Sequence, residues 1–150
     1  MRDYRVSKNL GGFNPQKLYM EILKSESTDS WYMQKLDDKT LISNGRALYI
    51  VPGRSPLAEG FIEEKSLNRV APKWEDGVSC VDTKSEMALS NKTVAKIFRK
   101  GEEDFYFNKD FFKYFTDGTF DYRMSDNGQS LYIAYKGELI AVIWGIRISK

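Results

Sequence analysis

Residues 120–148 read FDYRMSDNGQSLYIAYKGELIAVIWGIRI, and this stretch decides the fold. Its aromatic and β-branched clusters predict three strands, at 120–124, 131–135 and 138–148. Only Lys136-Gly137 separates the last two, which predicts a two-residue hairpin. Strands joined by so short a turn run antiparallel. The C-terminal part of the chain is therefore predicted to form an antiparallel sheet, with a further turn at Asp126-Asn127-Gly128.

The N-terminal half adds a helix and a hairpin. Asn14 suits an N-cap, because its side chain can accept a hydrogen bond from a free backbone N–H. The apolar residues Leu18 and Ile22 follow four apart, which predicts a helix at about 15–25. Further along, Asn44-Gly45 is a strong signal for a tight turn between two strands.

A second helix is predicted at about 91–100. The apolar residues Val94, Ile97 and Phe98 have helical spacing. Gly101 follows them, where a left-handed residue commonly ends a helix.

The rest of the chain completes an α+β fold. A third, short helix is predicted after Asn108, which can cap it. Residues 52–78 hold three prolines and three glycines, so we expect an irregular surface excursion there. The sequence thus predicts an antiparallel sheet packed against two or three short helices. We expect residues 1–12 to form a flexible lead-in and 13–150 a single domain.

The composition is that of a folded chain. Of its 150 residues, 41% are hydrophobic and 14% are aromatic. This apolar content is enough to offset the conformational entropy lost on folding. A chain of this length has room for one ordinary core.

Histidine is absent and Cys80 is the single cysteine. Their scarcity removes the Ser-His-Asp and Cys-His nucleophile systems, the histidine zinc sites and any internal disulfide. We therefore predict that the chain is not an enzyme and holds no metal or cofactor. Cys80 itself is predicted to be a small buried hydrophobic residue in a strand.

No run of about 18 apolar residues occurs, and no apolar run follows the N-terminal Met1-Arg2-Asp3. We expect no membrane segment, no signal peptide and a cytoplasmic location.

Charge is balanced. The 23 Lys and Arg residues face 21 Asp and Glu residues, giving a formal net charge of +2. Proteins whose affinity rests on phosphate neutralisation usually have a basic face. The balance leaves DNA contact open but does not indicate it, and a protein is the expected partner. The sequence does not predict an oligomeric state.

The two halves of the chain contain similar motifs in the same order. Phe13-Asn14 and Phe107-Asn108 each open a predicted helix, and each is followed by turns and then by Leu-Tyr-Ile, at residues 48–50 and 131–133. The order helix, strand, Asn-Gly turn, strand occurs twice, which suggests two half-repeats.

The second copy, residues 105–150, resembles the C-terminal part of bacterial DNA polymerase sliding clamps and of clamp-like small prophage proteins. The resemblance rests on Phe107-Asn108, on Phe120-Asp121-Tyr122-Arg123, on Ser130-Leu131-Tyr132-Ile133 and on the ending Ile143-Trp144-Gly145-Ile146-Arg147-Ile148. Clamps usually have Met-Pro where this chain has Trp144-Gly145. The resemblance implies clamp-like half-repeats and a phage or bacterial protein that acts on replication, repair or host-defence machinery, for example as an inhibitor.

Trp74 is the candidate binding residue. It lies in the irregular excursion, and the cationic residues Arg54, Arg69 and Lys73 are near it in sequence. A tryptophan between charges on a loop can anchor a partner, because its large ring loses little entropy on docking. The bland alternative is that Trp74 only covers the edge of the domain.

Two other functions stay open at this point. The pair Glu63 and Lys65, with Asp37 or Asp38 upstream, has the residue types of a small metal-dependent nuclease. The alternative is a small-ligand sponge, in which the excursion closes over a nucleotide-like molecule stacked on Trp74 or on a tyrosine. A solvated turn is the bland interpretation of the acidic residues.

Overall fold

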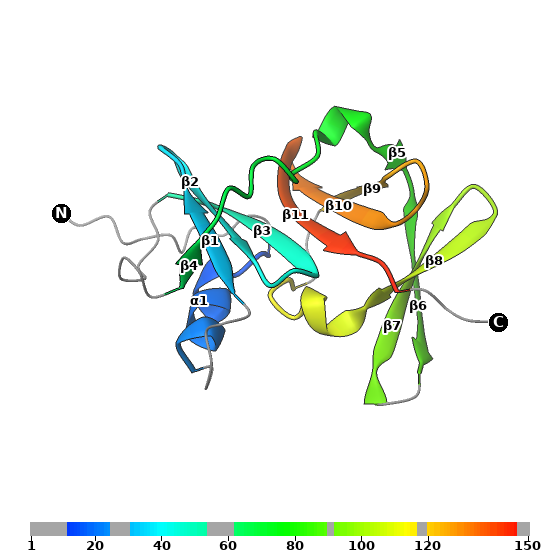
Figure 1. Cartoon of the computed structure of the whole chain (residues 1–150). Helices are drawn as coiled ribbons and strands as arrows, with labels where there is room; N and C mark the ends of the chain where they lie inside the picture. Colours follow the sequence, from blue (N-terminus) through cyan, green and yellow to red (C-terminus); the bar gives the residue numbers. More distant parts are fainter. Residues whose placement is uncertain (1–11, 25–30, 54–61, 90–91, 117–119, 147–150) are drawn as a thin grey trace. The chain divides into compact units, whose positions relative to one another are not determined.

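A computed structural model describes residues 12–24, 31–53, 62–89, 92–116 and 120–146 (Figure 1). The fold is α+β, as predicted, but strands dominate it. The chain divides into two compact units: residues 1–72 with 114–119, and residues 73–113 with 120–150. The chain therefore passes from the first unit to the second, returns briefly, and leaves again.

The first unit contains one helix and four strands. Its elements are α1 (Pro15–Lys24) and, in sheet order, β4 (Glu63–Glu64), β1 (Tyr32–Lys35), β2 (Lys39–Ser43) and β3 (Ala47–Pro52). Strands β1, β2 and β3 are antiparallel, whereas β4 runs parallel to β1. The predicted helix at 15–25 and the Asn44-Gly45 hairpin are both confirmed, and Asn44 Oδ1 accepts the Ala47 N–H at 2.9 Å.

The core of this unit is aromatic. Phe13 and Tyr49 are both 0% exposed, and their rings stack with 6.3 Å between centroids. Tyr114, which comes from the returning segment, meets Tyr49 edge-on at 5.2 Å. Residues from sequence positions about 65 apart thus complete one core.

The second unit is formed by strands and two short 3-10 turns. One sheet has the order β11 (Glu138–Trp144), β10 (Ser130–Tyr135), β9 (Asp121–Met124) and β5 (Val78–Ser79). The other has the order β6 (Val81–Ala88), β7 (Val94–Lys100) and β8 (Glu103–Asn108). The turns are η1 (Trp74–Asp76) and η3 (Lys109–Phe112).

The strands of these two sheets are linked at two places. On one side β5 continues into β6 through Cys80 alone. On the other side, Tyr106 of β8 bridges to Ile146, just beyond β11. The core between the sheets centres on Phe98, which is 0% exposed. The centroid of its ring lies 5.7 Å from that of Phe107 and 5.0 Å from that of Tyr122.

The predicted helix at 91–100 is wrong. Residues 94–100 instead form strand β7, which pairs with both β6 and β8. The spacing of Val94, Ile97 and Phe98 fits a helix, but β-branched and aromatic residues also favour strands, and sheet partners on both sides decide the outcome. Gly101 does adopt positive φ, of 64°, but in the β7–β8 hairpin.

The remaining predictions have different outcomes. The turn after Asn108 is one turn of 3-10 helix, with Asn108 Oδ1 accepting the Asp110 N–H at 2.9 Å, so α1 is the one α-helix among the described residues. The strands predicted at 120–124, 131–135 and 138–148 are confirmed as β9, β10 and β11, although β11 ends at Trp144. In the described part of the chain, no helix has the length and apolarity needed to cross a membrane.

Candidate protein interface

Trp74 is held by an arginine from a distant strand. It opens η1 and is half-buried. The Arg123 guanidinium carbon lies 4.4 Å from the centre of the indole ring, and Arg123 Nη1 donates to the Trp74 carbonyl at 3.0 Å. Because one arginine engages both the ring and the backbone, the turn has a defined position on β9.

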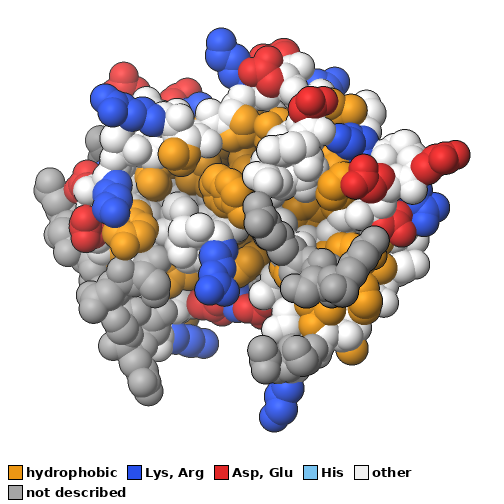
Figure 2. All heavy atoms as spheres, turned by 45° about the vertical axis from the view of Figure 1, so that its right-hand side comes forward, with side chains coloured by type: hydrophobic (Ala, Val, Ile, Leu, Met, Phe, Trp, Pro, Cys, Tyr) orange, Lys and Arg blue, Asp and Glu red, His pale blue; other side chains and the backbone are white. Residues whose placement is uncertain are grey.

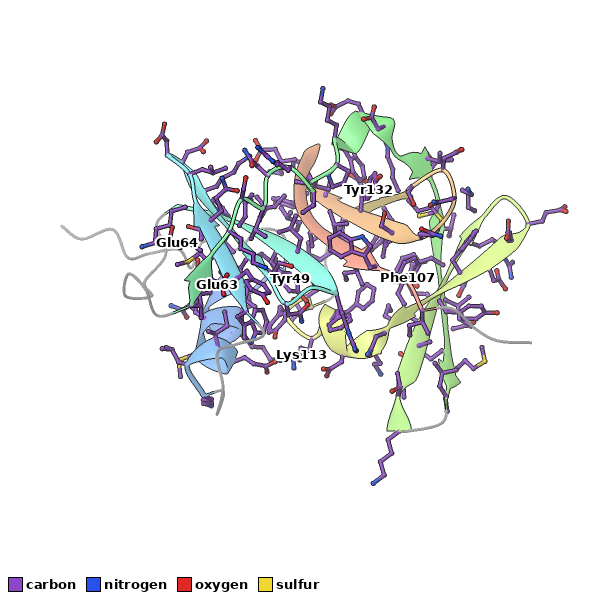
Figure 3. The ribbon with its side chains drawn as sticks, viewed as in Figure 1. Tyr49, Glu63, Glu64, Phe107, Lys113 and Tyr132 are labelled. Atoms are coloured by element: carbon purple, nitrogen blue, oxygen red, sulfur yellow. The ribbon has the colours of Figure 1, made fainter. Side chains whose placement is uncertain are left out.

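Gly77 allows the chain to pass directly over Tyr132. A Cβ on Gly77 would lie 2.7 Å from Arg123 Cβ and 2.7 Å from Cδ2 of Tyr132, which is closer than carbon atoms approach. Tyr132 is 6% exposed and sits on β10 (Figure 3), so it has little room to move aside. Close packing at Gly77 therefore sets where Trp74 lies.

This contact gives a prediction for Gly77→Ala. The added methyl group should displace η1 and lower the free energy of unfolding by about 1–3 kcal/mol, the usual cost of overpacking. Urea denaturation followed by near-UV circular dichroism, which reports on the environment of Trp74, measures both effects. Val78→Ala, at a side chain that is 38% exposed, is the control and should change stability by less than about 0.5 kcal/mol.

After Gly77 the chain presents two exposed valines. Val78 is 38% exposed and Val81 is 65% exposed. Val81 borders a shallow depression of about 390 Å³, which is lined by Ser79, Cys80, Val81, Thr83, Arg99 and Gly101. We call residues 74–83 the 74–83 segment.

Cys80 is part of the lining, is half-buried and lies between β5 and β6 in the sequence. Burial raises the pKa of its thiol to about 12, and the nearby Asp82 carboxylate acts in the same direction against an opposing effect of Lys100. The thiol is therefore protonated at neutral pH and is a poor nucleophile.

A bulge in β6 shapes the wall of the depression. The register with β7 shifts between Asp82 and Glu86, and Lys84 takes a φ of 63°. Thr83 Oγ1 donates to the Ile97 carbonyl at 2.7 Å and accepts the Ser85 N–H at 3.1 Å. Bulges bend an edge strand and re-aim its side chains, and here Thr83 becomes part of the lining.

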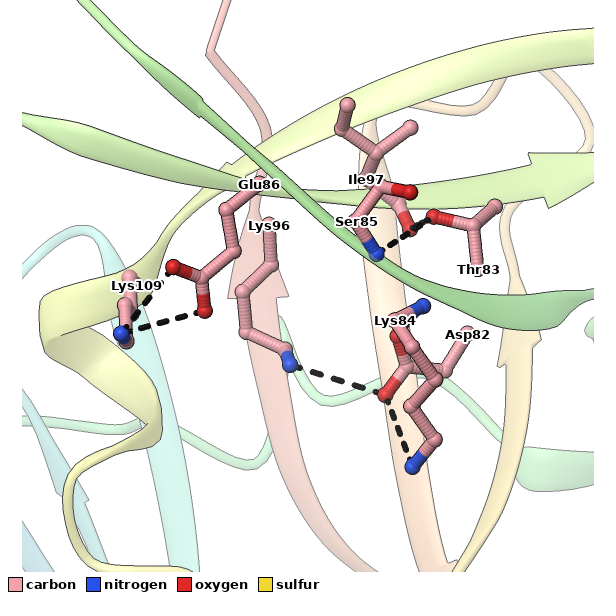
Figure 4. A network of polar contacts seen from close by, with 8 residues as sticks. All are labelled: Asp82, Thr83, Lys84, Ser85, Glu86, Lys96, Ile97 and Lys109. Carbon is pink, nitrogen blue, oxygen red and sulfur yellow. Dashed lines mark hydrogen bonds and ion pairs between the residues drawn. The ribbon is translucent and has the colours of Figure 1, made fainter.

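Ion pairs hold the bulge at both of its ends (Figure 4). The Asp82 side chain is only 7% exposed, and its Oδ2 lies 3.5 Å from Lys96 Nζ and 3.6 Å from Lys84 Nζ. Its Oδ1 accepts the Lys84 N–H at 2.9 Å. Further along β6, Glu86 pairs with Lys109 at 3.1 Å. The largely buried carboxylate thus forms ion pairs with two lysines and accepts one backbone hydrogen bond, as a buried charge requires.

Arg99 is the charged residue in the lining of the depression. It pairs with Asp104 through Nε–Oδ1 at 2.7 Å and Nη2–Oδ2 at 3.3 Å. The pair raises the pKa of Arg99 and lowers the pKa of Asp104, first through their hydrogen bond. Arg99 is exposed and Asp104 is partly exposed, so the pair orients the guanidinium more than it stabilises the fold.

Hydrophobic and charged side chains alternate on the surface. On the face drawn in Figure 2, hydrophobic groups reach the surface among Lys, Arg, Asp and Glu side chains of both signs. Charges of both signs therefore share this face, whereas a phosphate-binding face is usually basic.

The predicted binding residues have different outcomes. Lys73 and Trp74 both belong to the second unit, at the start of η1. Arg69 is exposed in a turn of the first unit, and Arg54 lies outside the described residues. Sequence reasoning missed Arg123, which is 49 positions from Trp74 along the chain.

The residues of the nuclease alternative lie at opposite ends of β1. Glu63 pairs with Tyr32 at the start of that strand, whereas Asp37 and Asp38 follow its end. The four residues of β1 span roughly 13 Å, which is far more than the distance between two side chains that bind the same cation. In the described ranges, no group of three Cys, Asp or Glu residues is placed to hold a metal ion.

Compared with known proteins, the chain matches no family model, no curated protein and no solved structure. The resemblance of residues 105–150 to sliding clamps therefore stays a prediction. In that stretch the structure describes β8, η3, β9, β10 and β11.

Proposed function

We propose that this chain is a non-enzymatic protein-binding module and that the 74–83 segment contacts the partner. The observation that carries the proposal is Val81, a β-branched apolar side chain left 65% exposed on an edge strand beside a shallow depression. Single exposed apolar residues are common on protein surfaces. Here a second exposed valine, a half-buried tryptophan and an oriented arginine accompany it.

The segment is preorganised for binding. Trp74 is stacked on Arg123, Gly77 packs on Tyr132, and the β6 bulge is held by the hydrogen bonds of Thr83. A surface that is already ordered loses little entropy when a partner docks. Trp and Arg are also the residue types enriched where binding energy is concentrated.

The two alternatives receive less support. The nuclease-like site is disfavoured by the separation of Asp37 and Asp38 from Glu63 along β1. A small ligand stacked on Trp74 competes with Arg123, which already lies 4.4 Å from the ring centre. An extended partner that contacts the valines and the rim of the depression has no such competitor.

The clamp resemblance suggests the setting in which the partner is found. We propose replication, repair or host-defence machinery of a bacterium or phage, with inhibition of a defence protein as one form of this activity. We propose a location in the cytoplasm on the same ground.

Capture from a nuclease-treated bacterial lysate tests this function. We expect one protein to be retained by the unchanged chain and reduced at least about tenfold by Val81→Glu, which corresponds to roughly 1.4 kcal/mol of binding free energy. The captured protein, once purified, is then titrated against both chains by calorimetry.

Val70→Glu is the matched control. Val70 is 55% exposed, close to the value for Val81, but belongs to the first unit. It should bind the partner as the unchanged chain does. Equal capture by Val81→Glu and Val70→Glu would rule out the 74–83 segment as the interface, and capture that disappears on nuclease treatment would instead indicate nucleic acid.

A further inference from the structure

Residues 109–116 belong to both units in turn. The first four residues form η3 of the second unit, and residues 114–116 belong to the first unit. Along the chain, Lys113 alone separates η3 from Tyr114. We call residues 109–116 the crossing segment.

The first part of the crossing segment is anchored on the three-stranded sheet. The Phe112 ring stacks on Phe98, with centroids 5.8 Å apart and planes 15° from parallel. Lys96 Nζ lies 5.5 Å from the Phe112 ring, and Lys109 pairs with Glu86 of β6 at 3.1 Å (Figure 4).

The second part is anchored in the core of the first unit. The Asn14 N–H donates to the Tyr114 carbonyl at 2.7 Å, and the Thr116 N–H donates to the Gly12 carbonyl at 2.9 Å. The Tyr114 hydroxyl donates to Glu21 Oε2 of α1 at 2.8 Å, and its side chain is 2% exposed. Phe115 packs against Phe13 at 4.9 Å.

We infer that the crossing segment couples its two anchors, the Phe112 contacts in the second unit and the Tyr114 contacts in the first. Eight consecutive residues are ordered by contacts in both units, and a single residue separates the anchors. When one anchor is lost, the residues that it held gain conformational entropy. The other anchor alone must then keep the segment ordered. Because such coupling is a free energy shared by two sites, weakening either anchor loosens the other to the same degree.

Amide hydrogen exchange of the full chain, followed by NMR, measures this coupling. Phe112→Ala removes the anchor in the second unit. We expect exchange at the Asn14 and Thr116 amides, in the first unit, to accelerate about tenfold. The Gly53 amide, which donates to the Asp38 carbonyl at 2.8 Å in the same unit, should exchange as before.

Met124→Ala is the control variant, because Met124 is 0% exposed in the second unit but lies outside the crossing segment. It destabilises that unit without touching the anchor, so the Asn14 and Thr116 amides should stay within about twofold of the unchanged chain. Unchanged exchange in Phe112→Ala, or equal acceleration in Met124→Ala, overturns the inference.

The reverse direction needs only a conservative change. Tyr114→Phe removes the hydroxyl that donates to Glu21. We expect the Asp110 amide, capped by Asn108 in the second unit, to exchange several-fold faster, whereas the Gly128 amide of that unit keeps its rate. Faster exchange at Thr116 with an unchanged Asp110 amide would show two independent anchors and overturn the coupling.

Discussion

Replacing Phe98 by alanine is expected to lower the free energy of unfolding of the second unit by about 3–5 kcal/mol. The side chain is 0% exposed, and its ring contacts Phe107, Phe112 and Tyr122 at 5.0–5.8 Å. Truncation removes the transfer free energy of the ring and leaves a cavity between the two sheets. Loss of the Phe112 contact also weakens the anchor of the crossing segment.

Urea denaturation followed by tryptophan fluorescence measures this loss. Trp74 and Trp144 belong to the second unit and Trp31 to the first, so a Trp31→Phe background restricts the signal to the second unit. Val81→Ala is the control, because an exposed valine should contribute less than about 0.5 kcal/mol. A loss below about 1 kcal/mol in Phe98→Ala would mean that Phe98 is not the centre of the core.

Local chemistry in the sequence predicted the turns and the first helix. Lys136-Gly137 allows only a hairpin, and both residues take positive φ, of 51° and 80°. Asn14 caps α1 by accepting the Lys17 N–H at 3.2 Å. These features depend on residues within a few positions of each other, so they can be recognised before the fold is known.

Strand β7 could not be predicted in the same way. Val94, Ile97 and Phe98 satisfy a helical spacing, and Gly101 has positive φ in a hairpin as it would at the end of a helix. What makes the segment a strand is its pairing with β6 and β8. Tertiary contacts of this kind override a local spacing.

The sequence predicted only some residues of the candidate interface. Trp74 and Lys73 stand out as an aromatic and a cation in an irregular stretch. Arg123 reaches Trp74 from β9, a contact that depends on the sheet order. Valine is typical of buried strands, so the sequence gives no sign that Val78 and Val81 are exposed. The chain passes from one sheet to the other at Cys80, and Val81 is 65% exposed there. The exposure of a side chain depends on how the sheets pack and not on the local sequence pattern.

Gly128→Ala is expected to lower the free energy of unfolding by roughly 2–4 kcal/mol, from two separate causes. Gly128 has a φ of 73°, a conformation in which an L-residue loses about 1 kcal/mol. A Cβ there would also lie 2.0 Å from Cε1 of Phe105, so the ring on β8 must move. The Asp126-Asn127-Gly128 turn is therefore fixed by packing as well as by its own chemistry.

Gly101→Ala separates these two causes. Gly101 has a similar φ of 64° in a hairpin of the same unit, but a Cβ there meets nothing within 4 Å. Its substitution should cost only the conformational term, about 1 kcal/mol. Urea denaturation of both variants gives the difference, which measures how firmly Phe105 holds the β9–β10 turn. Equal losses in the two variants would show that the ring moves freely and that the turn is not fixed by packing.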